Sequence, residues 1–316
     1  MSDIDDTRAR YERFALREAP GRSEVYREWA EGVAGDDEIL RVLSGLPSPH
    51  RQPPVVFAVT RMLGSGEGTY DEWARFVREN ADAIVAECAA RSTQTNEPLR
   101  CAPLVLALEQ VPGPIALIEV GASAGLCLFP DRYAYRFGDE PWLGSGAVAL
   151  ESELRGGIAG PSRLPEITWR AGIDIQPRDA RDPRDRAWIS GLVWPGERER
   201  AKRIDAALDI VAADPPLMIE GDASDPGVLA ELVARAPEGA TVVITTPGVL
   251  PHIPREPRER LIETIQQLPA RWITIDHATL HDAWTTPPAE GTGFVLAIDA
   301  RPIAEVDPLG GWIRAL

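Results

Sequence analysis

The hydrophobic periodicity of the chain changes near residue 112, and this change is the strongest constraint on its fold. Up to that point apolar residues recur at positions i, i+3 and i+4, a spacing typical of amphipathic helices. Turn-forming residues such as Pro47 and Gly64 separate the helical stretches. The expected helices cover residues 7–19, 23–32, 36–43, 54–63, 70–90 and 98–110. We therefore predict an all-helical N-terminal domain over residues 1–112.

From Ile115 onward, strand patterns alternate with helical patterns, which predicts a parallel sheet covered by helices. The expected strands are 116–120, 168–175, 217–220, 241–245, 272–277, 294–298 and 312–316. The expected helices are 185–192, 197–213, 226–236 and 255–268. No helix separates the last two strands, so we expect them to pair antiparallel. This element order predicts an α/β domain over residues 113–316 with a Rossmann-like methyltransferase fold, a mostly parallel seven-stranded sheet with an antiparallel last strand.

Residues 127–167 interrupt the alternation of strands and helices. Residues 133–137 and 148–152 have the alternating pattern of short strands. We therefore predict an inserted hairpin or meander before the second strand of the sheet.

Composition excludes several classes of protein. A net charge of −16 disfavours nucleic-acid binding, because phosphate contacts require clustered Lys and Arg. No apolar run approaches the roughly 18 to 20 residues of a membrane helix, and the N-terminus is charged where a signal peptide is apolar. The three cysteines have no C-x-x-C spacing, so no metal site is predicted. We expect a cytoplasmic protein that acts on a small molecule, without nucleic-acid or membrane partners.

The stretch from Ile115 to Leu128 predicts a buried strand, a tight turn of small residues and then a helix. Two kinds of active site begin in this way. Glu119-x-Gly121-x-Ser123-x-Gly125 resembles the glycine-rich loop of S-adenosylmethionine methyltransferases, in which backbone N–H groups at a helix N-terminus face the ligand. Gly121-x-Ser123-x-Gly125 also matches the G-x-S-x-G nucleophile turn of serine hydrolases.

The serine hydrolase reading requires an acid and a histidine in addition to Ser123. Asp222 with His252 or His277 supplies them in the order that this class uses. However, an α/β-hydrolase has several strands and an oxyanion loop before its serine, and helical segments precede Ser123 here. We therefore favour the cofactor loop and keep the hydrolase as the alternative.

Two further acids follow strands of the predicted sheet. Asp174 ends the second strand, where a carboxylate can accept hydrogen bonds from both ribose hydroxyls of the cofactor. Asp222 follows the third strand, where it can receive the adenine amino group. Asp174 can instead cap the turn that follows it, and Asp222 can cap the next helix.

The end of the fourth strand is the predicted substrate side of the site. It ends at Thr245 and Thr246, which would face the methyl group that is transferred. His252 in the loop that follows is the candidate general base.

Several segments together carry a resemblance to a known family. The chain is similar to the bacterial family catalogued as domain of unknown function 2332 in the segments Arg51–Pro54, Gln94–Glu97, Ile118–Gly125, Asp131–Tyr135, Gly172–Pro177, Trp188 and Val193–Pro195. The resemblance implies a helical N-terminal region joined to a methyltransferase-like domain, and it carries no established reaction. Cys127 departs from the family pattern, which commonly has a polar Asn there.

The segment Gln94-Thr-Asn-Glu97 is distinctive and lies just before the helix that leads to the first strand. Thr95 or Asn96 can cap that helix, with Pro98 in its first turn. Alternatively, Gln94, Asn96 and Glu97 form a polar wall over the cofactor.

The sequence thus predicts transfer of a methyl group from S-adenosylmethionine to an unidentified small molecule. The alternatives are a serine hydrolase that uses Ser123 and a methyltransferase-like binding module without catalysis.

Overall fold

The computed structural model describes residues 3–286, 291 and 293–316. The chain divides into two compact units. Unit 1 consists of residues 1–95 and 181–205, and unit 2 consists of residues 96–180 and 206–316. The residues between 96 and 112, which we assigned to the helical domain, therefore belong to the unit that contains the sheet.

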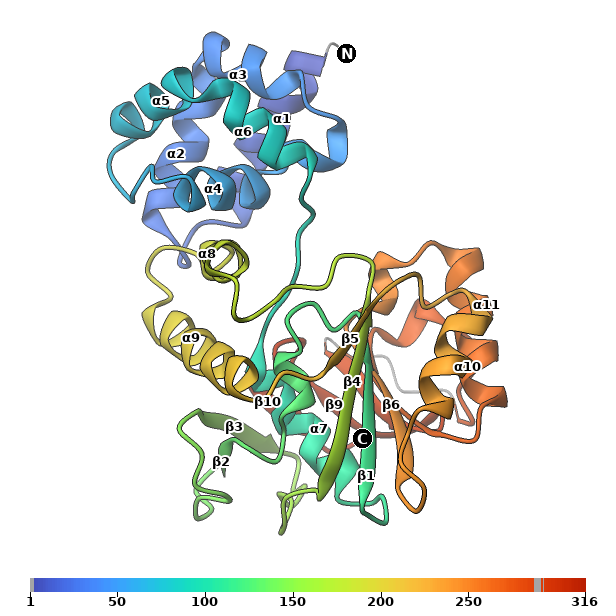
Figure 1. The fold of residues 1–316 in the computed structure, drawn as a ribbon. Coiled ribbons are helices and arrows are strands. Elements are labelled where there is room, and N and C mark those ends of the chain that lie inside the picture. The colour runs from blue at the N-terminus through green and yellow to red at the C-terminus, as the bar shows by residue number, and fades with distance from the viewer. Residues whose placement is uncertain (1–2, 287–290, 292) are drawn as a thin grey trace. The chain divides into compact units, whose positions relative to one another are not determined.

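The described residues of unit 1 form helices joined by loops, without strands, and helices α1 to α6 gather in one cluster (Figure 1). Its elements are α1 (Asp3–Arg17), α2 (Glu24–Gly35), α3 (Asp37–Ser44), the 3-10 helix η1 (Ser48–Arg51), α4 (Pro53–Met62), α5 (Tyr70–Glu79), α6 (Ala81–Ala89) and α8 (Pro183–Gly191). Helix α9 (Arg198–Ala213) begins in this unit. The predicted helical region is confirmed.

Local sequence signals explain where these helices begin and end. Ser23 caps α2 by accepting from the Tyr26 N–H at 3.2 Å. The single helix predicted over residues 70–90 is wrong, because Asn80 ends α5 and precedes α6. The Asn80 side chain donates to the Phe76 carbonyl at 2.9 Å, the kind of local bond by which Asn competes with a continuing helix.

Aromatic side chains form the core of unit 1 around Phe57 of α4. The Phe57 ring is fully buried and lies 4.8 Å from the ring of Tyr26, 5.4 Å from Trp29 and 5.5 Å from Trp73, centroid to centroid. Trp73 also donates from its indole N–H to the buried Thr60 hydroxyl at 2.8 Å. Because buried aromatic rings contribute large apolar areas, this cluster gives unit 1 a core of its own.

Unit 2 is built on a ten-stranded mixed sheet with the order β2-β3-β10-β9-β8-β7-β6-β1-β4-β5 (Figure 1). Its strands are β1 (Ile115–Val120), β2 (Ala134–Phe137), β3 (Ala149–Arg155), β4 (Ile167–Asp174), β5 (Leu217–Glu220), β6 (Thr241–Pro247), β7 (Arg271–Asp276), β8 (Phe294–Ile298), β9 (Arg301–Val306) and β10 (Trp312–Arg314). Its helices are α7 (Cys101–Leu108), α10 (Pro226–Ala234) and α11 (Arg255–Gln267), with short 3-10 helices η2 (Pro98–Arg100), η3 (Leu126–Leu128), η4 (Leu250–His252) and η5 (Ala278–Leu280). The predicted α/β architecture is confirmed.

Five neighbouring parallel strands make up one half of the sheet. Strand β1 pairs with β4 on one side and with β6 on the other, and β5 and β7 extend the two sides. The chain passes from β1 to β4 and β5, then returns to β6 and β7 on the other side. Strand order therefore reverses between β1 and β6, and the carboxyl ends of the strands at such a switch point are the usual ligand site of open α/β sheets.

The other half of the sheet differs from the prediction. The sheet has ten strands rather than seven, and the predicted pairing of 294–298 with 312–316 is wrong. Strand β9 lies between these segments and pairs antiparallel with both β8 and β10. This strand was not predicted because it contains Pro302, and proline within an apolar run argues against a central strand.

The predicted hairpin insertion is also wrong. Strands β2 and β3 form where short strands were expected, but they pair parallel with each other. Strand β3 then pairs parallel with β10, so the insertion extends the main sheet. This partner lies near the end of the chain, where no local pattern could indicate it.

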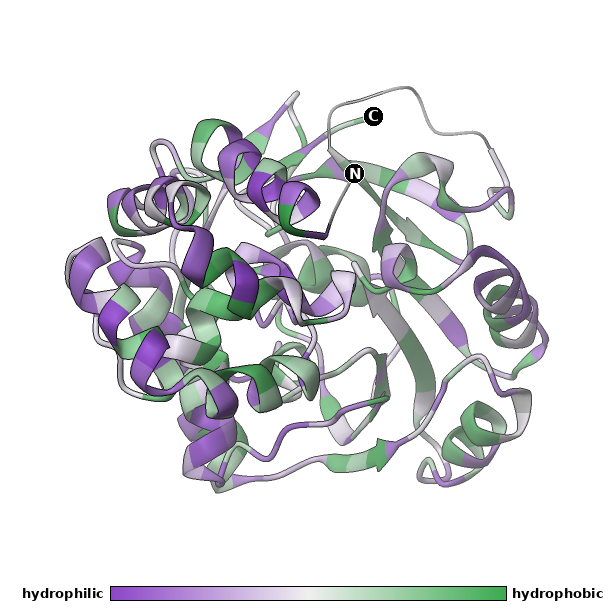
Figure 2. Ribbon diagram, turned by 90° about the horizontal axis from the view of Figure 1, so that it is seen from above, coloured by the Kyte–Doolittle hydropathy of each residue, from purple (hydrophilic) through white to green (hydrophobic). Residues whose placement is uncertain are grey.

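Helices α10 and α11 lie next to each other beside the sheet (Figure 1). Apolar side chains of the two helices and of the strands form one buried cluster. It includes Leu229, Leu232, Leu261 and Ile265 of the helices and Ile118, Ile244 and Trp272 of the strands. Many helices of the chain carry both hydrophilic and hydrophobic residues, as expected for amphipathic helices (Figure 2). Among the described residues, no helix has the length and apolar character needed to cross a membrane.

Candidate functional site

The loop after β1 lies at the switch point of the sheet. Gly121, Ser123 and Gly125 have positive φ values of 73°, 49° and 75°. Only three residues of 3-10 helix, η3, follow this loop, and the chain then enters β2. The predicted helix after the loop is therefore wrong. Leu126 to Phe129 are buried, and Pro130 disfavours helical backbone in the residue before it.

Backbone N–H groups of the loop are bonded within unit 2. Gly121 donates to the Ile173 carbonyl at 2.8 Å, and Ser123 donates to Oδ2 of Asp174 at 2.8 Å. In return, the Ser123 carbonyl accepts from the Arg178 N–H at 2.9 Å. These bonds fasten the loop to the end of β4. The expectation that N–H groups at a helix N-terminus face a ligand does not apply to this loop.

Asp174 and Asp222 both lie at the carboxyl edge of the sheet, after neighbouring strands. Asp174 is half-buried and its second oxygen, Oδ1, accepts from the Gln176 N–H at 2.8 Å. Asp222 is exposed and accepts from the Ser224 N–H at 2.8 Å. Asp174 therefore caps the turn after β4, one of the two roles that we considered for it. The cap of α10 is Asp225 rather than Asp222.

Two buried oxygens at the loop have no hydrogen-bond partner among the described residues. They are Oε2 of Glu119, the fifth residue of β1, and Oγ of Ser123. Their side chains are 4% and 5% exposed. Burial, together with the nearby Cys127 thiol, raises the pKa of Glu119 well above its usual range, and Arg100 opposes this effect. Because a buried polar atom without a partner is costly, these oxygens point to a polar group that the chain itself does not supply.

Asn96 and Glu97 are both buried near the residues that follow the loop. The Glu97 carbonyl accepts from the Cys127 thiol at 3.6 Å, and its carboxylate accepts from the Leu99 N–H at 3.0 Å. Glu97 therefore caps η2, where we had expected Thr95 or Asn96. Nδ2 of Asn96 is also buried and has no hydrogen-bond partner in the part of the chain that the structure describes. Gln94 belongs to unit 1, where its side chain accepts from the Trp188 indole at 3.2 Å.

Thr245 and Thr246 lie inside the sheet, and neither is exposed to solvent. The Thr245 hydroxyl donates to the Ile118 carbonyl at 3.3 Å, and the Thr246 hydroxyl accepts from the Trp272 indole at 3.1 Å. Both side chains therefore serve the packing of β6. His252 lies in η4, where partial burial and the Arg100 cation lower its pKa.

Two charged residues at the same edge were missed from the sequence. Arg100 ends η2 and donates from Nη1 to the Pro247 carbonyl at 2.8 Å. Asp276 ends β7 and is fully buried, and its carboxylate oxygen Oδ1 has no hydrogen-bond partner among the residues that the structure describes. Burial raises its pKa well above the usual range, against the effects of the Thr274 hydroxyl and of Arg100. A strand ending in an acid was a usable signal for Asp276, whereas nothing in the sequence marks Arg100.

A comparison with protein families finds one whose description is "Uncharacterized protein conserved in bacteria (DUF2332)", and its model matches residues 8–304. The chain belongs to the DUF2332 family. A search of curated proteins finds no match. The resemblance noted from the sequence is thereby confirmed as family membership, while the methyltransferase-like character remains a prediction.

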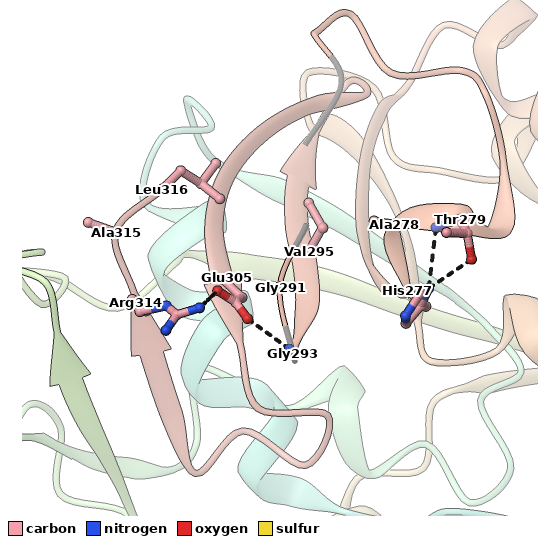
Figure 3. Close-up of a pocket in the computed structure, with 10 residues that line it drawn as sticks. All are labelled: His277, Ala278, Thr279, Gly291, Gly293, Val295, Glu305, Arg314, Ala315 and Leu316. Carbon is pink, nitrogen blue, oxygen red and sulfur yellow. Dashed lines mark hydrogen bonds and ion pairs between the residues drawn. The ribbon is translucent and has the colours of Figure 1, made fainter. Parts of the chain in front are cut away.

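This DUF2332 protein also has a cavity of about 400 Å³ over strands β7 to β10 (Figure 3). The Glu305 carboxylate lies between the Arg314 guanidinium and the Gly293 N–H, which donates to it at 2.7 Å. His277 turns toward Thr279, whose N–H donates to its Nδ1 at 3.3 Å (Figure 3). Among the described residues that line the cavity, the side-chain charges of Glu305 and Arg314 are therefore paired with each other. Among the described residues, no group of His, Cys, Asp or Glu is placed to hold a metal ion.

Proposed function

We propose that this protein binds S-adenosylmethionine at the carboxyl edge of β1, β4 and β5 and transfers its methyl group to a small molecule. The observation that carries the proposal is the pair of buried oxygens without partners, Glu119 Oε2 and Ser123 Oγ, beside a left-handed loop at the switch point. Parallel strand order around β1 supports it, because open α/β sheets bind ligands at this place.

Asp174 and Asp222 are the residues that would hold the nucleoside. Each of their carboxylates bonds to backbone N–H groups, and each oxygen retains a lone pair that can accept from a hydroxyl or amino group. Gly121 and Gly125 add no side chain at two positions of the loop with positive φ, and Glu119 offers a buried carboxyl group to a polar part of the cofactor.

When bound, S-adenosylmethionine would supply a methyl group activated by its sulfonium, and S-adenosylhomocysteine would be the leaving group when the acceptor nucleophile bonds to that methyl. The chain's part is to align the two molecules and exclude water, so no conspicuous catalytic residue is required. An acceptor that attacks through an O–H or N–H group would also lose one proton for each methyl group gained. His252 is the candidate proton acceptor, because its lowered pKa favours the neutral imidazole.

Calorimetry and thermal melting with S-adenosylmethionine and S-adenosylhomocysteine test the proposal. A ligand that binds the folded state raises the melting temperature by mass action. The absence of heat and of a thermal shift with both compounds would refute cofactor binding. Binding without loss of the methyl group in the presence of candidate acceptors would favour the non-catalytic binding module.

One observation keeps the serine hydrolase as a second candidate. Ser123 has a φ of 49°, and strained backbone of this kind is found at the nucleophile of G-x-S-x-G enzymes. However, its hydroxyl is buried and bonds to no histidine among the described residues. A fluorophosphonate probe decides: we expect no labelling of Ser123, and covalent labelling there would establish the hydrolase.

A further inference from the structure

The Arg100 guanidinium is held in place by two backbone carbonyls from different parts of unit 2. Its Nη1 donates to Pro247 at the end of β6, at 2.8 Å, and its Nε donates to Pro308 in the loop between β9 and β10, at 2.9 Å. Both carbonyls lie at the carboxyl edge of the parallel strands. The guanidinium is therefore fixed at this edge, on the β6 side of the switch point.

Gly248 makes room for the guanidinium. A Cβ atom at this position would lie 2.8 Å from Nη2 and 2.9 Å from Cζ and Nη1 of Arg100. Gly248 also has a φ of 74°, a backbone angle that residues with a side chain rarely adopt. The backbone after β6 thus lies directly against the guanidinium, and any side chain at this position would displace it.

Among the described residues, no ion pair includes Arg100. Four other arginines whose side chains are at most 18% exposed each have one. The titratable groups whose pKa Arg100 affects are Glu119, Asp276 and His252. Burial raises the pKa of both acids and lowers that of the histidine, so each shift favours the neutral form. Arg100 is thus a fixed cation among groups that tend to be uncharged, in a chain of net charge −16.

Arg100 keeps a donor available. Its Nη2 has no hydrogen-bond partner among the described residues, and this atom is accessible to solvent. Two N–H bonds on this nitrogen can therefore reach a ligand. Arginine donors suit carboxylate and phosphate oxygens, to which they form short charge-assisted bonds.

We propose that Arg100 binds an anionic oxygen group, a carboxylate or a phosphate, of the methyl acceptor at the carboxyl ends of β6 and β7. This inference rests on the proposed function for the identity of the ligand as an acceptor. Asp174 and Asp222, the nucleoside candidates, follow β4 and β5, whereas Arg100 contacts the end of β6. The two ligands would then lie on opposite sides of the switch point.

Titration of the full chain with acetate and with inorganic phosphate, at constant ionic strength, tests the anion site. The readouts are calorimetry and the NMR signal of the Arg100 Nε–H. This signal is assigned as the one that is missing from the spectrum of Arg100→Lys. We expect saturable binding of at least one anion, with the Nε–H signal shifting in parallel. Binding should weaken by about tenfold or more in Arg100→Gln and by less in Arg100→Lys.

Arg136→Gln is the matched control, because it removes the same charge from an exposed arginine that is paired with Glu151. It should bind both anions as the wild type does. Equal weakening in Arg136→Gln would show a general charge effect and overturn the proposal. So would the absence of any shift of the Arg100 signal, a measurement on the wild type that does not depend on whether Arg100→Gln folds.

S-adenosylhomocysteine and methylthioadenosine separate this inference from the proposed function. If the anion belongs to the acceptor, Arg100→Gln keeps its affinity for both nucleosides. If Arg100→Gln loses affinity for S-adenosylhomocysteine alone, Arg100 binds the carboxylate of the cofactor, and the assignment to the acceptor is wrong. If the wild type binds the anion at Arg100 but neither nucleoside, the proposed cofactor fails while the anion site stands.

Discussion

The backbone N–H of Ser123 donates to Oδ2 of Asp174 at 2.8 Å, and this bond joins the loop after β1 to the end of β4. The other oxygen of the same carboxylate accepts from the Gln176 N–H. One side chain therefore fixes two turns at the carboxyl edge of neighbouring strands. Its role in the fold and its proposed role toward a ligand are linked, because both depend on the same carboxylate.

Asp174→Ala should lower the free energy of unfolding by about 1 to 3 kcal/mol, because it removes the acceptor of two N–H groups, of which that of Ser123 is partly buried and that of Gln176 is exposed. Asp174→Asn retains one acceptor oxygen and should cost less. Both variants should weaken binding of S-adenosylhomocysteine. Urea denaturation and calorimetry measure the two effects. An unchanged stability in Asp174→Ala would mean that solvent replaces the carboxylate in both turns.

Gly121→Ala should destabilise the protein by more than about 1 to 2 kcal/mol, the cost of left-handed backbone for a residue with a side chain. The added Cβ would also lie 2.3 Å from Cγ2 of Val249, the residue that follows Gly248. Combining it with Val249→Ala removes that atom, so the double variant should recover part of the loss. Strictly additive effects in denaturation would contradict this contact between the loop and the residues after β6.

The parallel half of the sheet was predictable because its signals are local. Each of its strands is a short apolar run, and the runs that end at Val120 and Asp174 lie within a residue of their predicted positions. The other half was not predictable in the same way. Strand β3 finds its partner β10 far along the chain, and a sequence pattern does not encode such a pairing.

In the candidate site, too, local patterns indicated some residues, whereas others depend on long-range contacts. Asp174 and Asp222 follow strands, and the rule that carboxyl ends of parallel strands share an edge was enough to place them together. Arg100 is at this edge only because its side chain reaches the carbonyls of Pro247 and Pro308. The absence of a helix after the glycine loop likewise depends on the burial of η3, which the small residues of the loop do not indicate.

Phe57→Ala should cost about 3 to 5 kcal/mol, because it leaves a cavity among the rings of Tyr26, Trp29 and Trp73. Phe57→Leu fills most of the volume and should cost less than about 1.5 kcal/mol. Hydrogen exchange locates the effect, which we expect in the helices of unit 1. Equal losses in the two variants would argue against tight packing around Phe57.

His281 should make the protein less stable in mild acid. The ring is 8% exposed, lies 4.0 Å from that of Trp284, centroid to centroid, and accepts at Nδ1 from the Ala283 N–H at 3.2 Å. Burial lowers the pKa of His281 from 6.5 to about 4, while Asp282 acts to raise it and Arg258 to lower it further. As the pH falls from 6.5 toward 4, the unfolded chain therefore binds a proton that the folded chain excludes, and stability is lost over this window.

His281→Asn keeps an acceptor near Nδ1 and does not titrate, so the stability advantage of the wild type over this variant should shrink between pH 7 and about 4. Urea denaturation across this range measures the difference, and an advantage that stays constant with pH would show that His281 does not have the lowered pKa.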